Sequence, residues 1–66
     1  MRNSLDVMVA ARHSAVDYIN RNQMVDRNLE RIAHNMAKRD RVPYAYRELF
    51  VAHWVKHARH LAVHTT

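Results

Sequence analysis

Four histidines near the C-terminal end of the chain would share one side of an α-helix. They follow one another at spacings of four, three and four residues, and this repeat keeps side chains on one helix face. Two imidazoles four residues apart can chelate a divalent metal. The neighbourhood lacks the carboxylate that usually orients a metal-bound imidazole, and the chain has no cysteine. We therefore predict neither a metal site nor a cofactor for these histidines, which are His53, His57, His60 and His64.

The segment that carries these histidines begins with aromatic residues: Tyr44, Tyr46, Phe50 and Trp54. One interpretation is that this group closes a helical hairpin by packing over Met36 and Val42. The alternative is an anchor patch for another protein, because tyrosine, tryptophan and arginine are enriched at interface hot spots. This second interpretation predicts a partner-binding set that consists of Phe50, His53, Trp54, His57 and His60.

A stripe of basic residues marks the middle of the chain. Its members lie at i, i+4, i+7, i+11 and i+14, opposite an apolar row that runs from Val25 to Met36. Cations at this spacing can follow a phosphate backbone and release its counterions. The alternative is an ordinary solvated face, since Asp26 and Glu30 are interleaved and can pair with neighbouring cations. The predicted nucleic-acid-binding residues are Arg27, Arg31, His34, Lys38 and Arg41.

Nothing in the sequence indicates catalysis. The chain has no glycine, so it has no glycine-rich phosphate loop, and no paired carboxylates lie in an apolar setting. A helix-turn-helix over Leu29–Leu49 fails because charged residues occupy the turn and Pro43 comes too late. We therefore name no catalytic residue and expect a protein that is not an enzyme.

The elements that must position these side chains are helices. Primed hairpin turns usually need glycine, asparagine or aspartate, and a chain without glycine disfavours a sheet. Ser4 is the expected N-cap of a first helix, with Leu5, Met8, Val9, Ala15, Val16 and Ile19 along its apolar side. Pro43 ends the second helix and suits the first turn of the third. We predict a single all-α domain over residues 1–66, a small helical bundle with helices at about 4–19, 23–41 and 44–62 and a C-terminal antiparallel helical hairpin.

A competing arrangement joins the first two helices into one. A heptad track can be drawn from Met8 through Asn22 to Met36, and a buried asparagine in such a track favours dimers. Two long helices would then replace three shorter ones. Such a helix would leave its N-terminal apolar stripe bare unless the chain dimerises. If the chain instead breaks near residues 20–23, three helices can close on themselves and a dimer is optional. With only 66 residues to form a core, a homodimer is still the expected state.

Charge and composition narrow the function classes. Lys and Arg number 11 against 6 Asp and Glu, which gives a formal net charge of +5. The absence of cysteine fits a reducing interior, so we expect a cytoplasmic protein, and no uncharged run approaches the length that spans a bilayer. The first functional hypothesis is a small basic accessory or regulatory protein that binds nucleic acid. The second is a protein-binding modulator that docks on an acidic protein surface through its histidine and aromatic residues, without a membrane in either case.

Overall fold

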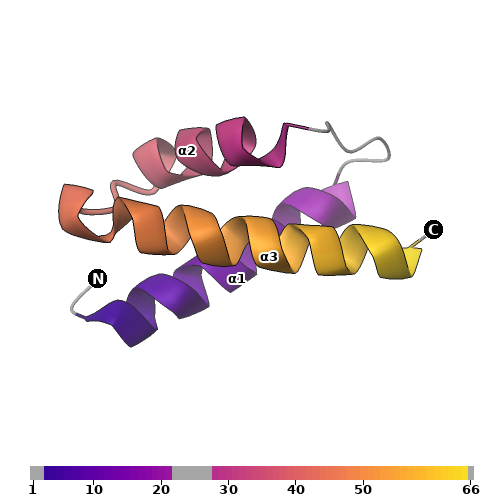
Figure 1. The fold of residues 1–66 in the computed structure, drawn as a ribbon, viewed down its shortest axis with the longest axis horizontal. Helices are drawn as coiled ribbons and strands as arrows, with labels where there is room; N and C mark the ends of the chain where they lie inside the picture. Colours follow the sequence, from indigo (N-terminus) through magenta and orange to yellow (C-terminus); the bar gives the residue numbers. More distant parts are fainter. Residues whose placement is uncertain (1–2, 22–27, 66) are drawn as a thin grey trace.

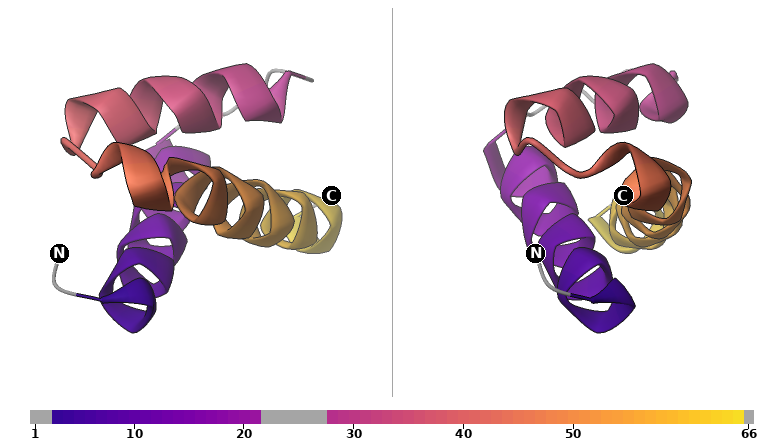
Figure 2. Two further views of the ribbon diagram at one scale, coloured as in Figure 1. Left: turned by 60° about the vertical axis from the view of Figure 1, so that its left-hand side comes forward. Right: turned by 90° about the vertical axis from the view of Figure 1, so that its left-hand side faces the viewer.

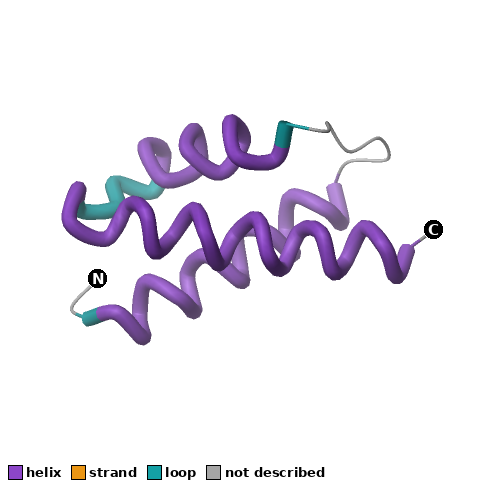
Figure 3. The backbone as a smooth tube through the Cα atoms, viewed as in Figure 1, coloured by secondary structure: helices purple, strands orange, loops and turns teal. Residues whose placement is uncertain are grey.

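The computed structural model describes residues 3–21 and 28–65, with side chains up to residue 61. Every regular element in this part of the chain is helical, which confirms the all-α prediction (Figures 1 and 3). Helix α1 spans Ser4–Arg21 and α2 spans Leu29–Arg39. A short 3-10 turn, η1, spans Tyr44–Tyr46 and leads directly into α3, which spans Arg47–Thr65.

Helix α3 is the central element, and both other helices pack on it. Helices α2 and α3 run in opposite directions and form the expected antiparallel hairpin (Figure 1). Helix α1 crosses α3 on another side, as the two rotated views show (Figure 2). The three helices therefore enclose one core between them.

The core depends on the contrast between large side chains on α3 and small ones on its neighbours. Phe50 and Trp54 have no exposed surface, while alanines four residues apart on α1 and α2 allow the helices to approach closely. The Trp54 Nε1–H donates to the Ser14 hydroxyl over 3.0 Å, and the Tyr18 ring lies 5.4 Å from the Trp54 ring. This hydrogen bond satisfies the one polar atom of the buried indole. The buried set is Val7, Ala11, Ala15, Ile19, Leu29, Ala33, Ala37, Val42, Phe50, Val51, Trp54, Val55 and Ala58.

The start of α1 differs from the prediction in its cap and in its buried row. Asn3, not Ser4, is the N-cap: its Oδ1 accepts the Asp6 backbone N–H at 2.9 Å. The buried row is Val7, Ala11, Ala15 and Ile19. Leu5 and Val9, which were expected in the core, are 61% and 47% exposed.

The chain does not continue from α1 into α2 as one helix, so the continuous-helix alternative is wrong. Asn28 has a non-helical backbone, and its Oδ1 accepts the Arg31 N–H at 3.2 Å. The second helix thus begins at Leu29, later than the predicted residue 23. Asn22, considered above as a dimer-specifying residue, lies outside the described residues.

The end of α2 and the start of α3 also move by a few residues. Helix α2 ends at Arg39, and Arg41 has a left-handed backbone with φ of 55°. Pro43 precedes η1 as expected for a first helical turn, but this turn is 3-10, and α3 itself continues to Thr65. Arg41 and η1 therefore form the corner of the hairpin.

Candidate functional site

The outer face of α2 carries the central part of the predicted basic stripe. Arg31 and Lys38 are exposed, and they lie two helical turns apart, about 10 Å along the axis. This face is opposite the buried row Leu29, Ala33 and Ala37 because that row packs on α3. The helix thus presents two cations directly to solvent. Arg27, the first residue of the predicted stripe, lies outside the described residues.

Arg41 lies in the turn that follows the C-terminal end of α2. The Val42 N–H donates to the Ala37 carbonyl at 3.0 Å, and the Arg41 N–H donates to the Lys38 carbonyl at 3.2 Å. These two bonds form a Schellman motif, in which the left-handed position is usually glycine. The side chain of Arg41 is exposed. A fixed turn thus holds this cation beside the last turn of α2.

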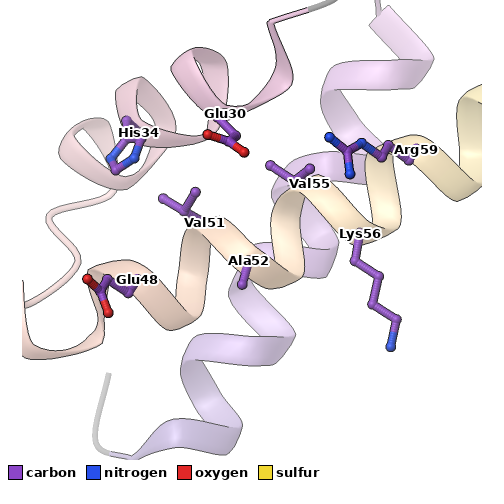
Figure 4. A pocket seen from close by; sticks show the side chains of 8 residues that line it. All are labelled: Glu30, His34, Glu48, Val51, Ala52, Val55, Lys56 and Arg59. Carbon is purple, nitrogen blue, oxygen red and sulfur yellow. The ribbon is translucent and has the colours of Figure 1, made fainter.

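His34 has different surroundings from the other members of the stripe. It lines a groove of about 720 Å³ between α2 and α3, together with Glu30 and Glu48 (Figure 4). At the far end of the groove Arg59 lies beside Val55, while Lys56 points away from α2 (Figure 4). The groove therefore holds both signs of charge, and His34 lies at its acidic end rather than among the cations of the outer face.

The acids near the stripe do not neutralise it by direct contact. Across residues 3–21 and 28–61, the one ion pair joins Arg21 to Asp17 on α1, at 3.0 Å. The expected pairing of Glu30 with Arg31 or His34 is absent from that part of the chain. Arg31, Lys38 and Arg41 are thus available to an external anion.

At the hairpin corner, Tyr44 belongs to the aromatic group considered above as an anchor patch for a protein, whereas the sequence assigned no binding role to Arg47. Tyr44 is 86% exposed, and the Arg47 guanidinium carbon lies 5.8 Å from the centre of its ring. Arginine over one ring face is a cation–π contact, and it leaves the other face of Tyr44 open for a stacked base. The signal in the sequence was the Tyr44–Arg47 spacing directly after Pro43, which places the two side chains one turn apart.

The second predicted set, on α3, does not form one surface. Phe50 and Trp54 are fully buried and hold α3 against its neighbours, so they present no surface to a partner in the folded chain. His53 and His57 are half-buried with their rings stacked at 6.3 Å, and His60 is exposed. Only the histidines of this set therefore reach the surface.

The environment of His57 is electropositive. Its pKa lies below the usual 6.5, first because burial disfavours the charged ring and then because Arg12, His53, Lys56 and His60 repel a second positive charge. Arg12 belongs to α1, so this group bridges the α1–α3 contact. Within the described part of the chain, no cluster of three or more His, Asp or Glu side chains could hold a metal ion.

Comparison with known proteins adds no relative. No protein-family model, curated protein or solved structure matches this chain. Among the described residues, no helix has the length and apolar content needed to cross a bilayer.

Proposed function

We propose that this protein binds nucleic acid through the outer face of α2 and the adjoining hairpin corner. The observation that carries the proposal is a set of exposed cations, Arg31, Lys38 and Arg41, that have no acidic partner among the described residues. Such cations contact phosphates and release counterions, which produces affinity without reading base sequence. Tyr44, three residues after Arg41 at the hairpin corner, adds an exposed aromatic ring on which an unpaired base can stack.

The alternative function, a modulator that docks through the histidine and aromatic face of α3, has weaker support. Phe50 and Trp54 were its expected anchors, and both are needed inside the core. The remaining histidines are flanked by Arg12 and Lys56, which favours an anionic partner but does not supply an apolar anchor. The geometry thus favours the α2 face as the primary binding surface.

Dimerisation remains a prediction. The three helices enclose a core without a second copy, so a dimer would serve binding rather than folding. On nucleic acid, two copies would place two basic faces along the same backbone and increase the number of phosphate contacts.

The test measures binding of the full chain to fluorescein-labelled duplex and single-stranded oligonucleotides by fluorescence anisotropy over a series of salt concentrations. Arg31→Ala/Lys38→Ala removes two proposed phosphate contacts. It should weaken binding to unrelated sequences alike and reduce the slope of log K against log salt by about 1.8 for duplex. Lys56→Ala/Arg59→Ala is the matched control, because it removes the same charge from exposed positions on α3.

Two results would contradict the proposal. One is the absence of binding to both oligonucleotides at low salt. The other is equal loss of affinity in the α2 and α3 double variants, which would indicate attraction by net charge alone.

A further inference from the structure

A second apolar row of α1 lies outside the core. Leu5 is 61% exposed, Val9 is 47% exposed, and Met8 and Val16 are half-buried. None of these side chains belongs to the core or to the partly buried hydrophobic residues that pack against it. Their spacing places them along one side of α1. We call this set, Leu5, Met8, Val9 and Val16, the outer row.

A cation interrupts the outer row near its middle. Arg12 is exposed, and it lies three residues after Val9 and four before Val16, so the three side chains are neighbours on the helix. Arg12 is also near enough to His57 to affect its protonation. Arg12 thus lies at the border between the outer row and the part of α3 that carries Lys56 and His57.

The two acids of α1 lie on a different helical row from the outer row. Asp17 lines the groove between α1 and α2, where it pairs with Arg21. Asp6 follows the same helical row as Ala10, His13 and Asp17, at spacings of four, three and four. The outer row thus combines exposed apolar side chains with Arg12 inside it, and Asp6, three residues before Val9, borders the row on the side away from Arg12.

We propose that the outer row is a docking surface for an acidic amphipathic helix of another protein. The apolar face of that helix would cover Leu5, Val9 and Val16, and a carboxylate at its border would pair with Arg12. Recognition by alternating three- and four-residue anchors is the usual way in which one amphipathic helix binds another. Arginine suits the central position because its guanidinium forms two parallel hydrogen bonds with a carboxylate.

Charge argues against a second copy of this chain as the occupant. A twofold antiparallel pairing of two outer rows would place the two Arg12 side chains within about one helical turn of each other. Like charges at such spacing are destabilising, so an acidic partner fits this surface better than a self-contact.

A lipid surface fits less well for a different reason. Helices that lie on membranes keep their cations on the polar face and usually carry Trp, Phe or Leu on the apolar face. Here Arg12 lies within the apolar row, and the row has no aromatic residue. A carboxylate of a protein partner can form a salt bridge with Arg12 directly.

The test titrates the ¹⁵N-labelled full chain with a synthetic amphipathic helix of about 20 residues, long enough to be helical in isolation. One peptide has leucines on one face and glutamates along the border of that face, and its matched control has lysines in place of the glutamates. We expect the glutamate peptide to shift the amide resonances of residues 5–16 and of His57, and to bind at least about tenfold more tightly than the lysine peptide.

Variants then locate the contact. Leu5→Asp/Val9→Asp and Arg12→Glu should each weaken binding of the glutamate peptide by about tenfold or more, and Arg12→Glu should improve binding of the lysine peptide. Circular dichroism checks that these exposed substitutions leave the helix content unchanged. Arg31→Ala/Lys38→Ala should leave peptide affinity within about twofold of that of the unmodified chain. The outer-row variants should likewise leave nucleic-acid affinity within about twofold, because the two surfaces are independent.

Several outcomes would overturn the proposal. Equal affinity for the glutamate and lysine peptides would do so, as would binding that Leu5→Asp/Val9→Asp does not change. A doubling of mass in sedimentation that this variant abolishes would assign the outer row to a second copy. Binding to phosphatidylglycerol vesicles that the same variant abolishes, without peptide binding, would assign it to a lipid surface.

Discussion

Arg41 occupies a position where glycine has a lower conformational energy. Its φ of 55° is left-handed, and a residue with a Cβ adopts this conformation at a cost of about 1–2 kcal/mol. The Schellman bonds and the burial of Val42 keep the turn in place despite this cost. A basic side chain at this position is consistent with a role outside folding, which the proposed phosphate contact provides.

Replacing Arg41 separates these two roles. Arg41→Gly should raise the free energy of unfolding by roughly 1 kcal/mol, because the left-handed cost disappears. The same variant should weaken duplex binding and reduce the salt slope by about 0.9, which corresponds to one lost phosphate contact. Urea unfolding measures the first effect and anisotropy the second. Arg41→Lys is the control, because it keeps both the charge and the conformational cost; no gain in stability for Arg41→Gly over Arg41→Lys would refute the strain argument.

Among the helices, α1 shows where sequence patterning reaches its limit. Two apolar rows with helical spacing overlap on it, one containing Val7 and Ala11 and the other containing Leu5 and Val9. Hydrophobicity alone favours the row with larger side chains. The structure buries the smaller ones, because alanine lets α1 approach the bulky Phe50 and Trp54. Shape complementarity between α1 and α3 therefore determines which row of α1 is buried. The apolar pattern of α1 alone does not show how its side chains fit those of α3.

Helix α3 was easier to predict because its large side chains all lie on one side. Val51, Trp54, Val55 and Ala58 follow one another at spacings of three, one and three residues, which predicts one apolar side of a helix, and all four are buried. The start of α2 was predicted wrongly because several asparagines in this stretch could serve as its N-cap. The hydrogen bond from the Arg31 N–H identifies Asn28 as the N-cap. For the binding residues, exposure separated two sets that looked similar in sequence: Arg31 and Lys38 face solvent, whereas Phe50 and Trp54 do not.

The contact between α1 and α3 should make stability depend on pH through His57. The pKa of His57 in the folded state is below 6.5. The larger cause is burial, and the smaller one is repulsion from Arg12 and the neighbouring basic groups. The unfolded chain therefore takes up this proton at higher pH than the folded chain does. Stability is unaffected by His57 above pH 6.5 and falls as the pH decreases below that value, down to the lowered folded-state pKa.

Thermal unfolding at about pH 7.5 and about pH 5.5 checks this sign. The melting temperature of the unmodified chain should fall more between these two conditions than that of His57→Gln, which has no imidazole to protonate. His13→Gln removes an exposed imidazole from α1 and should behave like the unmodified chain. An equal fall in all three proteins would show that His57 does not carry the effect.

The whole molecule is compact enough to fold as a single copy. Its radius of gyration is 11.1 Å, close to the ~10.8 Å expected for a compact chain of this length. The α2 face and the outer row of α1 lie on different helices that pack on separate sides of α3. The two proposed ligands, nucleic acid and a protein helix, would therefore not compete for one surface.

Protein concentration distinguishes folding as a single copy from folding as an obligate dimer. For an obligate dimer, the melting temperature rises with concentration, because association and folding are one reaction. Here α3 is covered by α1 and α2 from its own chain, so we expect the same melting temperature over about a hundredfold range of concentration. Sedimentation in the presence and absence of duplex then tests whether dimers form on nucleic acid alone. A melting temperature that rises with concentration would mean that the three-helix core is insufficient to keep a single copy folded. The outer row of α1 would then be the first surface to test as a contact with a second copy. Arg12→Ala should strengthen that contact, because it removes the repulsion between the two Arg12 side chains.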